Sequence, residues 1–112
     1  MALTHVFAGI PVYDRDAALA WYERLTGRPP DLIPNDSEAA WQLTATGWIC
    51  VMADAGQAGT ALHTVLVDDL EDFLAGVAQR GLSTGPVETI GERVRFVVLV
   101  DPDGNRLKVG QA

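Results

Sequence analysis

The stretch Asp101-Pro102-Asp103-Gly104-Asn105-Arg106-Leu107 lies between two apolar segments near the end of the chain. Asp, Pro, Gly and Asn are the residues that β-turns favour, so this stretch predicts a tight turn. The segments on either side, 93–100 and 105–109, are rich in β-branched and apolar residues and predict strands. Together with residues 85–90 they give three strands at the C-terminal end of the chain.

Upstream of these strands, the sequence predicts one more strand followed by a helix. Residues 62–67 are rich in β-branched residues, as strands are. Asp68-Asp69 supplies an N-cap for a helix over 70–80, and Gly81 ends that helix. One face of the predicted helix is apolar and carries Leu70, Phe73, Leu74 and Val77. Residues 60–110 therefore predict a βαβββ unit.

The first half of the chain repeats this order of elements. Residues 5–13 alternate as a half-buried strand does, Asp14 caps a helix over 16–27, and short antiparallel strands follow within 31–53. Placing Asp14 on Asp69 superposes the two strand–cap–helix units. The sequence therefore predicts one α+β domain over 1–112, made of two βαβββ repeats at about 4–54 and 60–110.

The composition limits the kinds of partner. The chain has 112 residues, of which 48% are hydrophobic, and a net charge of −7. This charge disfavours both nucleic acid and anionic membranes as partners. The single cysteine, Cys50, and the absence of a signal peptide or a long apolar run predict a cytoplasmic protein.

Three segments resemble the vicinal oxygen chelate superfamily, which includes glyoxalase I, extradiol dioxygenases and bleomycin-binding proteins. They run from Ile10-Pro11-Val12-Tyr13-Asp14 to Gly27, from Val67-Asp68-Asp69-Leu70 to Gly81, and through Asp101–Leu107. The resemblance implies a curved mixed sheet with helices on its convex face and a cavity on its concave face. It also implies a homodimer, in some members with swapped halves.

Metal-dependent members of that superfamily hold a divalent ion with His or Glu from the first and last strands of each half. The matching positions in this chain are Phe7, Val51, Leu62 and Lys108. Phe, Val and Leu cannot ligate a metal ion, and a protonated lysine repels one. The resemblance therefore implies that the metal ligands are lost, and we expect no metal and no other cofactor.

Strand alternation gives a second view of the same surface. If Phe7 faces the cavity, then Ile10 and Val12 face the helices, as do Cys50 and Met52, Val65 and Val67, and Leu107 and Val109. The cavity side then combines apolar with basic residues, which suits a small-molecule site. We also include Trp41, because bleomycin-binding relatives stack flat rings on aromatic side chains. The predicted ligand-binding residues are Phe7, Gly9, Trp41, Val51, Leu62, Thr64, Arg106 and Lys108.

Several of these residues allow more than one role. Lys108 can bind an anion together with Arg106, act as a base or Schiff-base nucleophile, or extend to the rim of the site. His63 is expected to pack on the helix side and His5 to be exposed. A metal site that joins these two histidines would need a different strand register. Trp21, Trp48 and Cys50 are expected in the core.

The leading functional hypothesis is a metal-independent protein that binds or sequesters a small aromatic or anionic molecule. One alternative is an enzyme, either a lyase or isomerase that uses Lys108 or a dioxygenase-like protein with a metal site in another register. The other alternative is a dimeric interaction module without small-molecule chemistry.

Overall fold

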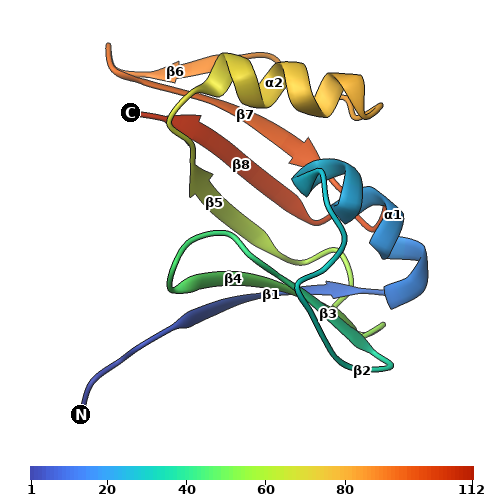
Figure 1. The fold of residues 1–112 in the computed structure, drawn as a ribbon. Helices are drawn as coiled ribbons and strands as arrows, with labels where there is room; N and C mark the ends of the chain where they lie inside the picture. The colour runs from blue at the N-terminus through green and yellow to red at the C-terminus, as the bar shows by residue number, and fades with distance from the viewer.

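The structure, a computed structural model, describes residues 1–112 and has eight strands and two helices (Figure 1). The first half contains β1 (Val6–Val12), α1 (Arg15–Thr26), β2 (Leu32–Asn35), β3 (Glu38–Gln42) and β4 (Gly47–Ala53). The second half contains β5 (Leu62–Leu66), α2 (Leu70–Gln79), β6 (Glu88–Ile90), β7 (Val94–Val100) and β8 (Arg106–Gln111). The predicted order of elements, βαβββ twice, is confirmed.

Each half forms one four-stranded mixed sheet. The strand orders are β1-β4-β3-β2, called sheet A here, and β5-β8-β7-β6, called sheet B. The first strand of each half pairs in parallel with the last, and the remaining pairs are antiparallel. No backbone ladder joins β1 to β5, so the expected curved sheet is divided at this point into two sheets.

The helices begin and end within one residue of the positions that the sequence indicates. The Asp14 carboxylate accepts hydrogen bonds from the backbone N–H groups of Asp16 and Ala17, and Asp69 caps α2 in the same way. Gly27 ends α1 with a φ of +77°, a left-handed conformation that glycine adopts without strain. Neither helix is both long and apolar enough to cross a membrane.

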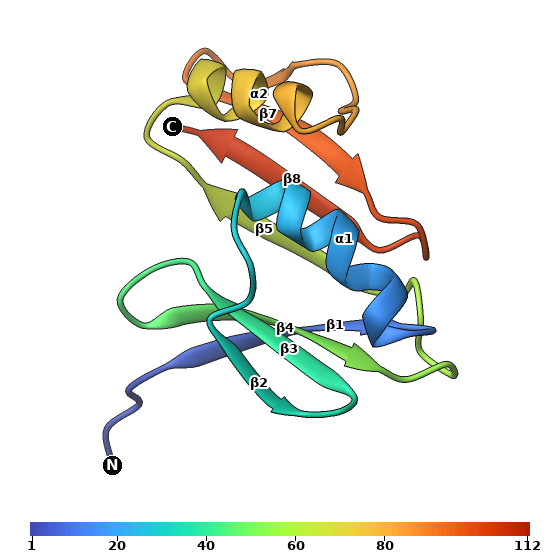
Figure 2. The same cartoon turned by 45° about the vertical axis from the view of Figure 1, so that its right-hand side comes forward.

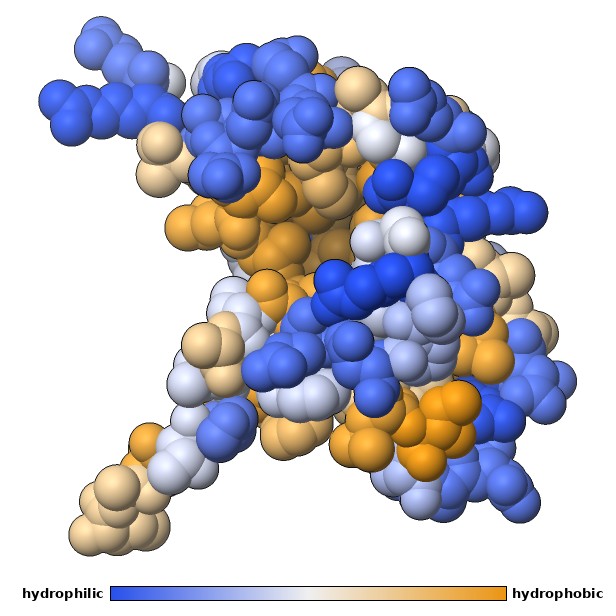
Figure 3. All heavy atoms as spheres, in the orientation of Figure 1, coloured by the Kyte–Doolittle hydropathy of each residue, from blue (hydrophilic) through white to orange (hydrophobic).

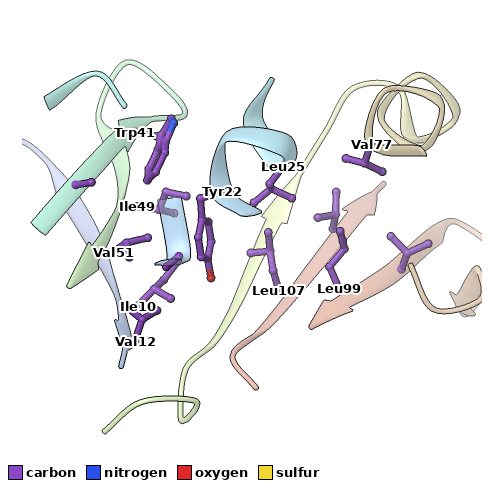
Figure 4. Packing of buried hydrophobic residues seen from close by; sticks show 14 of the residues in the cluster. Ile10, Val12, Tyr22, Leu25, Trp41, Ile49, Val51, Val77, Leu99 and Leu107 are labelled. Atoms are coloured by element: carbon purple, nitrogen blue, oxygen red, sulfur yellow. The ribbon is translucent and has the colours of Figure 1, made fainter. Parts of the chain in front are cut away.

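The hydrophobic core runs through both halves because α1 lies between the two sheets (Figure 2). On one side, Tyr22 of α1 packs against Ile10 and Ile49 of sheet A, as Figure 4 shows. On the other side, Leu25 of α1 points toward Leu107 of sheet B. The α2 helix covers sheet B alone. One helix therefore supplies buried surface to both halves, so neither half has a complete core without it.

A buried polar junction also ties the halves together. The Tyr22 hydroxyl donates a hydrogen bond of 2.6 Å to Asp101, in the turn before β8. The side-chain amide of Asn105 donates to the same carboxylate at 2.9 Å and to the Pro11 carbonyl at 2.7 Å. Its oxygen accepts from the Ala61 N–H at 2.9 Å. The 101–105 segment is thus the predicted turn and also a link between the two sheets.

Replacing Tyr22 with Phe should destabilise the fold by about 1–3 kcal/mol, because the Asp101 carboxylate loses a donor in a site that water does not reach. Tyr22 is 2% exposed, whereas the only other tyrosine, Tyr13, is 65% exposed. Tyr13→Phe is therefore the matched control and should change stability by less than about 0.5 kcal/mol. Urea denaturation of both variants measures the difference, and equal stabilities would contradict the role of the junction.

Candidate functional site

A cavity of about 590 Å³ lies between the two sheets, beside the C-terminal end of α1. Figure 3 shows it as a hollow lined by apolar side chains, on the side from which the N-terminal segment leaves the body. Ala8 and Ile49 line it from sheet A, Val65 and Leu107 line it from sheet B, and Phe73 lines it from α2. A volume of this size is typical of small-molecule sites.

This cavity lies on the side of the sheets that faces the helices, which differs from our expectation. We predicted the cavity on the face that carries Phe7, whereas the lining residues Ala8, Val65 and Leu107 lie on the opposite face. The reason is that α1 packs between the two sheets near the 101–105 turn, whereas the space between the sheets beyond the C-terminal end of α1 is not filled by the helix. We call the faces that point away from the helices the outer faces.

The two nitrogen-bearing side chains that line the cavity, His63 and Arg28, are already engaged with the protein. The Nε2 of His63 lies 2.8 Å from the Gly9 carbonyl, so in neutral His63 this nitrogen carries the proton. The Arg28 guanidinium donates to the Gln42 carbonyl and to Asp31. The Gln42 N–H and the Arg28 guanidinium hold the pKa of Asp31 below its usual range. The cavity therefore offers a ligand mainly apolar contacts.

Most of the predicted ligand-binding residues lie together on the outer faces. Phe7 and Gly9 belong to sheet A. On sheet B, Leu62 lies beside Arg106, and Thr64 lies beside Lys108. The Lys108 ammonium is 4.5 Å from the centre of the Phe96 ring on β7, a distance typical of a cation–π contact. These outer faces carry no helix, and they combine apolar side chains with Arg106, Lys108 and the acidic Glu38 and Glu88.

The prediction for β4 is wrong by one residue. The parallel register places Ile10 beside Val51 and Phe7 beside Trp48. Val51 is fully buried in the core and so cannot line the outer face, and Ile49 shares its side. Cys50, Met52 and Trp48 instead belong to the outer face, where Trp48 stacks on Phe7 with ring centres 5.4 Å apart.

Trp41 also lies elsewhere than expected for a ligand contact. Its side chain has no exposed surface and packs against Tyr22 of α1. The indole N–H donates to the Arg28 carbonyl at 3.0 Å, which satisfies its one polar atom inside the core. The tryptophan on the outer face of the first half is therefore Trp48, which we expected in the core.

The register also changes the residue that matches Lys108 in the first half. Gly9 and Thr64 each lie five residues before the capping aspartate of their half. Gly9 pairs with Cys50, and Thr64 pairs with Lys108. The counterpart of Lys108 is therefore Cys50, not Val51.

The residues at the four superfamily metal positions do not fit a divalent ion. With the corrected register these positions hold Phe7, Cys50, Leu62 and Lys108, of which only the cysteine can ligate a metal. No group of three or more His, Cys, Asp or Glu side chains is arranged to hold a metal ion. His63 packs on the helix side, as expected, and His5 is exposed.

Cys50 lies beside a carboxylate. Its Sγ is 3.2 Å from Glu38 on β3, and the side chain is almost completely buried. Burial and the Glu38 carboxylate together raise the pKa of the thiol to about 11. The Asn35 amide and the Cys50 thiol hold the pKa of Glu38 below its usual range. Nothing in the sequence pattern indicated this pair, because Glu38 and Cys50 come from different strands.

Comparison with known proteins gives structural relatives. A glyoxalase/bleomycin resistance protein from Catenulispora acidiphila is 37% identical, with a TM-score of 0.92 over 98% of this chain and 99% of that one. A bleomycin-binding protein complexed with bleomycin is 22% identical, with a TM-score of 0.79 over 98% of this chain and 99% of that one. The antibiotic-binding protein TnmS3 from a Streptomyces species is 20% identical, with a TM-score of 0.77 over 99% and 98% of the two chains.

The two relatives below 25% identity share the fold. No protein-family model and no curated protein matched the sequence.

The Cys50–Glu38 pair predicts a slow thiol. At pH 8 Cys50 should be protonated almost completely, since its pKa of about 11 lies well above that pH. Its alkylation by iodoacetamide should therefore accelerate as the pH rises toward 11. Glu38→Gln removes the neighbouring negative charge and should move the pH profile to lower values. A profile unchanged by this substitution would show that the carboxylate does not act on the thiol.

Proposed function

The chain belongs to the glyoxalase/bleomycin resistance protein family, and from this membership we propose that it binds a small aromatic or anionic molecule without a metal ion. The observation that supports this most strongly is the position of Lys108, which lies above the Phe96 ring on a sheet face that no helix covers. An ammonium group beside an aromatic ring can receive the charged end of an aromatic anion.

The surroundings of Lys108 fit a ligand of this class. Arg106 lies two residues away on the same face, and neither cation forms an ion pair within the chain. Leu62 and Val100 lie on either side of Arg106 in adjacent strands and are 53% and 55% exposed. Apolar surface next to unpaired cations offers both contacts that an aromatic anion needs.

The first half supplies aromatic side chains for the same role. Phe7 and Trp48 form a stacked pair on the outer face of sheet A. Gly9 and Cys50 follow them on the same face, and the Met52 side chain lies over Gly9. A flat ligand can therefore stack on the exposed aromatic pair.

The names of the relatives point to the same class of function. One relative carries bleomycin in its structure, and another is named as an antibiotic-binding protein. Binding of this kind needs a complementary surface and no catalytic group. We therefore propose that the protein sequesters a drug-like molecule. The main contacts would be Phe7, Trp48, Leu62, Arg106 and Lys108.

We further propose that the chain acts as a homodimer. Each outer face exposes large apolar side chains, and monomeric proteins rarely leave such patches uncovered. The outer face of sheet A carries the acidic Glu38, whereas that of sheet B carries Arg106 and Lys108 on its central strand and Glu88 on its edge strand. A two-fold dimer can place sheet A of one copy opposite sheet B of the other, which would enclose the ligand between them.

Anthracene-2-carboxylate is a suitable probe for the Lys108 site. Lys108→Met should weaken its affinity about tenfold, since a charge-assisted contact is lost. Arg93→Met removes the same charge from an exposed turn and should leave the affinity unchanged. The neutral anthracene-2-carboxamide should bind wild type and Lys108→Met equally. Titration calorimetry measures these affinities. A second titration, after dialysis of the protein against EDTA, tests metal independence: loss of binding after this treatment would refute it.

Introducing a charged side chain into the proposed interface tests whether the protein forms this dimer. Leu62→Glu places a carboxylate on the outer face of sheet B and should yield monomers in sedimentation velocity experiments. Tyr13→Glu is the control, since Tyr13 is also exposed, at 65% against 53% for Leu62, but follows β1 outside both sheet faces. Wild-type protein that sediments as a monomer would refute the dimer, whatever the variants do.

A further inference from the structure

One edge of β1 is free of any ladder. The Val6 N–H donates to the Thr46 carbonyl, and the Val12 carbonyl accepts from the Asp54 N–H. The even-numbered residues of β1 therefore direct their backbone groups toward β4. The odd-numbered residues, Phe7 among them, direct their N–H and C=O groups to the opposite edge, which faces β5.

The facing edge of β5 is free in the same way. The Arg106 N–H donates to the Ala61 carbonyl, and the Val67 N–H donates to the Gly110 carbonyl. The odd-numbered residues of β5 therefore pair with β8, and Thr64 and Leu66 direct their backbone groups toward β1. The two edges belong to different sheets and do not bond to each other.

The edges of β1 and β5 are connected near Pro11 by side-chain hydrogen bonds and not by a backbone ladder. His63 Nε2 lies 2.8 Å from the Gly9 carbonyl, and the Asn105 amide donates to the Pro11 carbonyl at 2.7 Å. The Gly59 N–H also reaches Pro11, at 3.3 Å. Beyond His63, toward Leu66 and Val6, no hydrogen bond joins the two edges. The edges thus form a fork that is closed near Pro11 and open near Leu66.

The open end of the fork is the 590 Å³ cavity. Thr64 and Leu66, which direct their backbone groups toward β1, line this cavity. The other lining residues are mainly apolar, and the one arginine among them, Arg28, is held by Asp31. A ligand in the fork therefore meets apolar side chains and unpaired backbone N–H and C=O groups, with no free charge.

We propose that the fork is a second binding site, which takes an uncharged peptide-like molecule with apolar side groups. Such a ligand extends as a short strand along β5 and forms amide hydrogen bonds with Thr64 and Leu66. Its side groups contact the apolar walls supplied by Val65, Val67 and Phe73. This site is separate from the Lys108 surface, which lies on the outer face of sheet B and selects a charged ligand.

The probe for the test is N-acetyl-Leu-Val-Leu-N-methylamide, with its fully N-methylated analogue as the comparison. The parent peptide should bind the full chain saturably and shift the amide resonances of residues 62–67. The analogue keeps the apolar groups but has no N–H donors, so it should bind about tenfold more weakly or less. Equal affinity of the two peptides, or no saturable binding of the parent, would overturn the proposal, and neither outcome depends on a variant that folds.

Leu66→Pro tests the protein side of the same contact. Proline removes an N–H that β8 does not use, so the ladder is kept while affinity for the parent peptide should fall about tenfold. Leu66→Val keeps the N–H and should bind as wild type. Lys108→Met should bind the peptide normally, which separates this site from the proposed aromatic site. Binding that appears only after removal of residues 1–5 would assign the fork to the N-terminal segment of a second copy and overturn the proposal.

Discussion

The Asp101 carboxylate is the point on which the arrangement of the two halves depends. It accepts hydrogen bonds from the Tyr22 hydroxyl, from the Asn105 side chain and from the backbone N–H groups of Asp103 and Asn105. A buried charged group is tolerated only when its oxygens are satisfied in this way. Burial, followed by the hydrogen bond to Asp101, raises the pKa of Tyr22 well above its usual value, so the phenol remains a donor. The helix of one half and the last turn of the other are thus held at a fixed distance.

This constraint determines which surfaces remain open. Because α1 is fixed between the sheets at the Asp101 end, the sheets diverge toward the other end and enclose the apolar cavity. Arg80 reinforces the wedge, since its guanidinium donates to the Arg24 and Leu25 carbonyls at the end of α1. With both helices packed on the inner side, the outer faces of both sheets have no cover. The cavity and the outer faces are therefore two consequences of one packing solution.

The sequence predicts those parts of the molecule in which polarity alternates. In β1, β5 and β8 one face is apolar and the other is mixed, so the positions of Ile10, Val65 and Val109 in the core and of Phe7 and Lys108 outside it follow from period two. In β4 the run Trp48-Ile49-Cys50-Val51 is apolar on both faces, and alternation carries no information there. The match of Val51 with Lys108 rests on the position of each, four residues after a turn glycine, Gly47 and Gly104, and this spacing is wrong by one residue in the first half. The division of the sheet between β1 and β5 depends on His63 and Asn105, whose partners are backbone carbonyls that no sequence pattern identifies.

The distribution of positive charge separates the two proposed sites. Of the eight basic residues, Arg15, Arg28 and Arg95 form ion pairs, and Arg80 binds helix carbonyls. Acidic residues outnumber basic ones by 15 to 8, yet Arg106 and Lys108 remain unpaired on adjacent positions of one apolar face. Neither cation forms an ion pair with the acidic side chains around it, so both can attract an external anion. The fork has no such cations, and its free groups are backbone amides. A charged aromatic ligand and a neutral amide ligand would therefore be sorted to different surfaces of the same small domain, by electrostatics on the outer face and by strand geometry between the sheets.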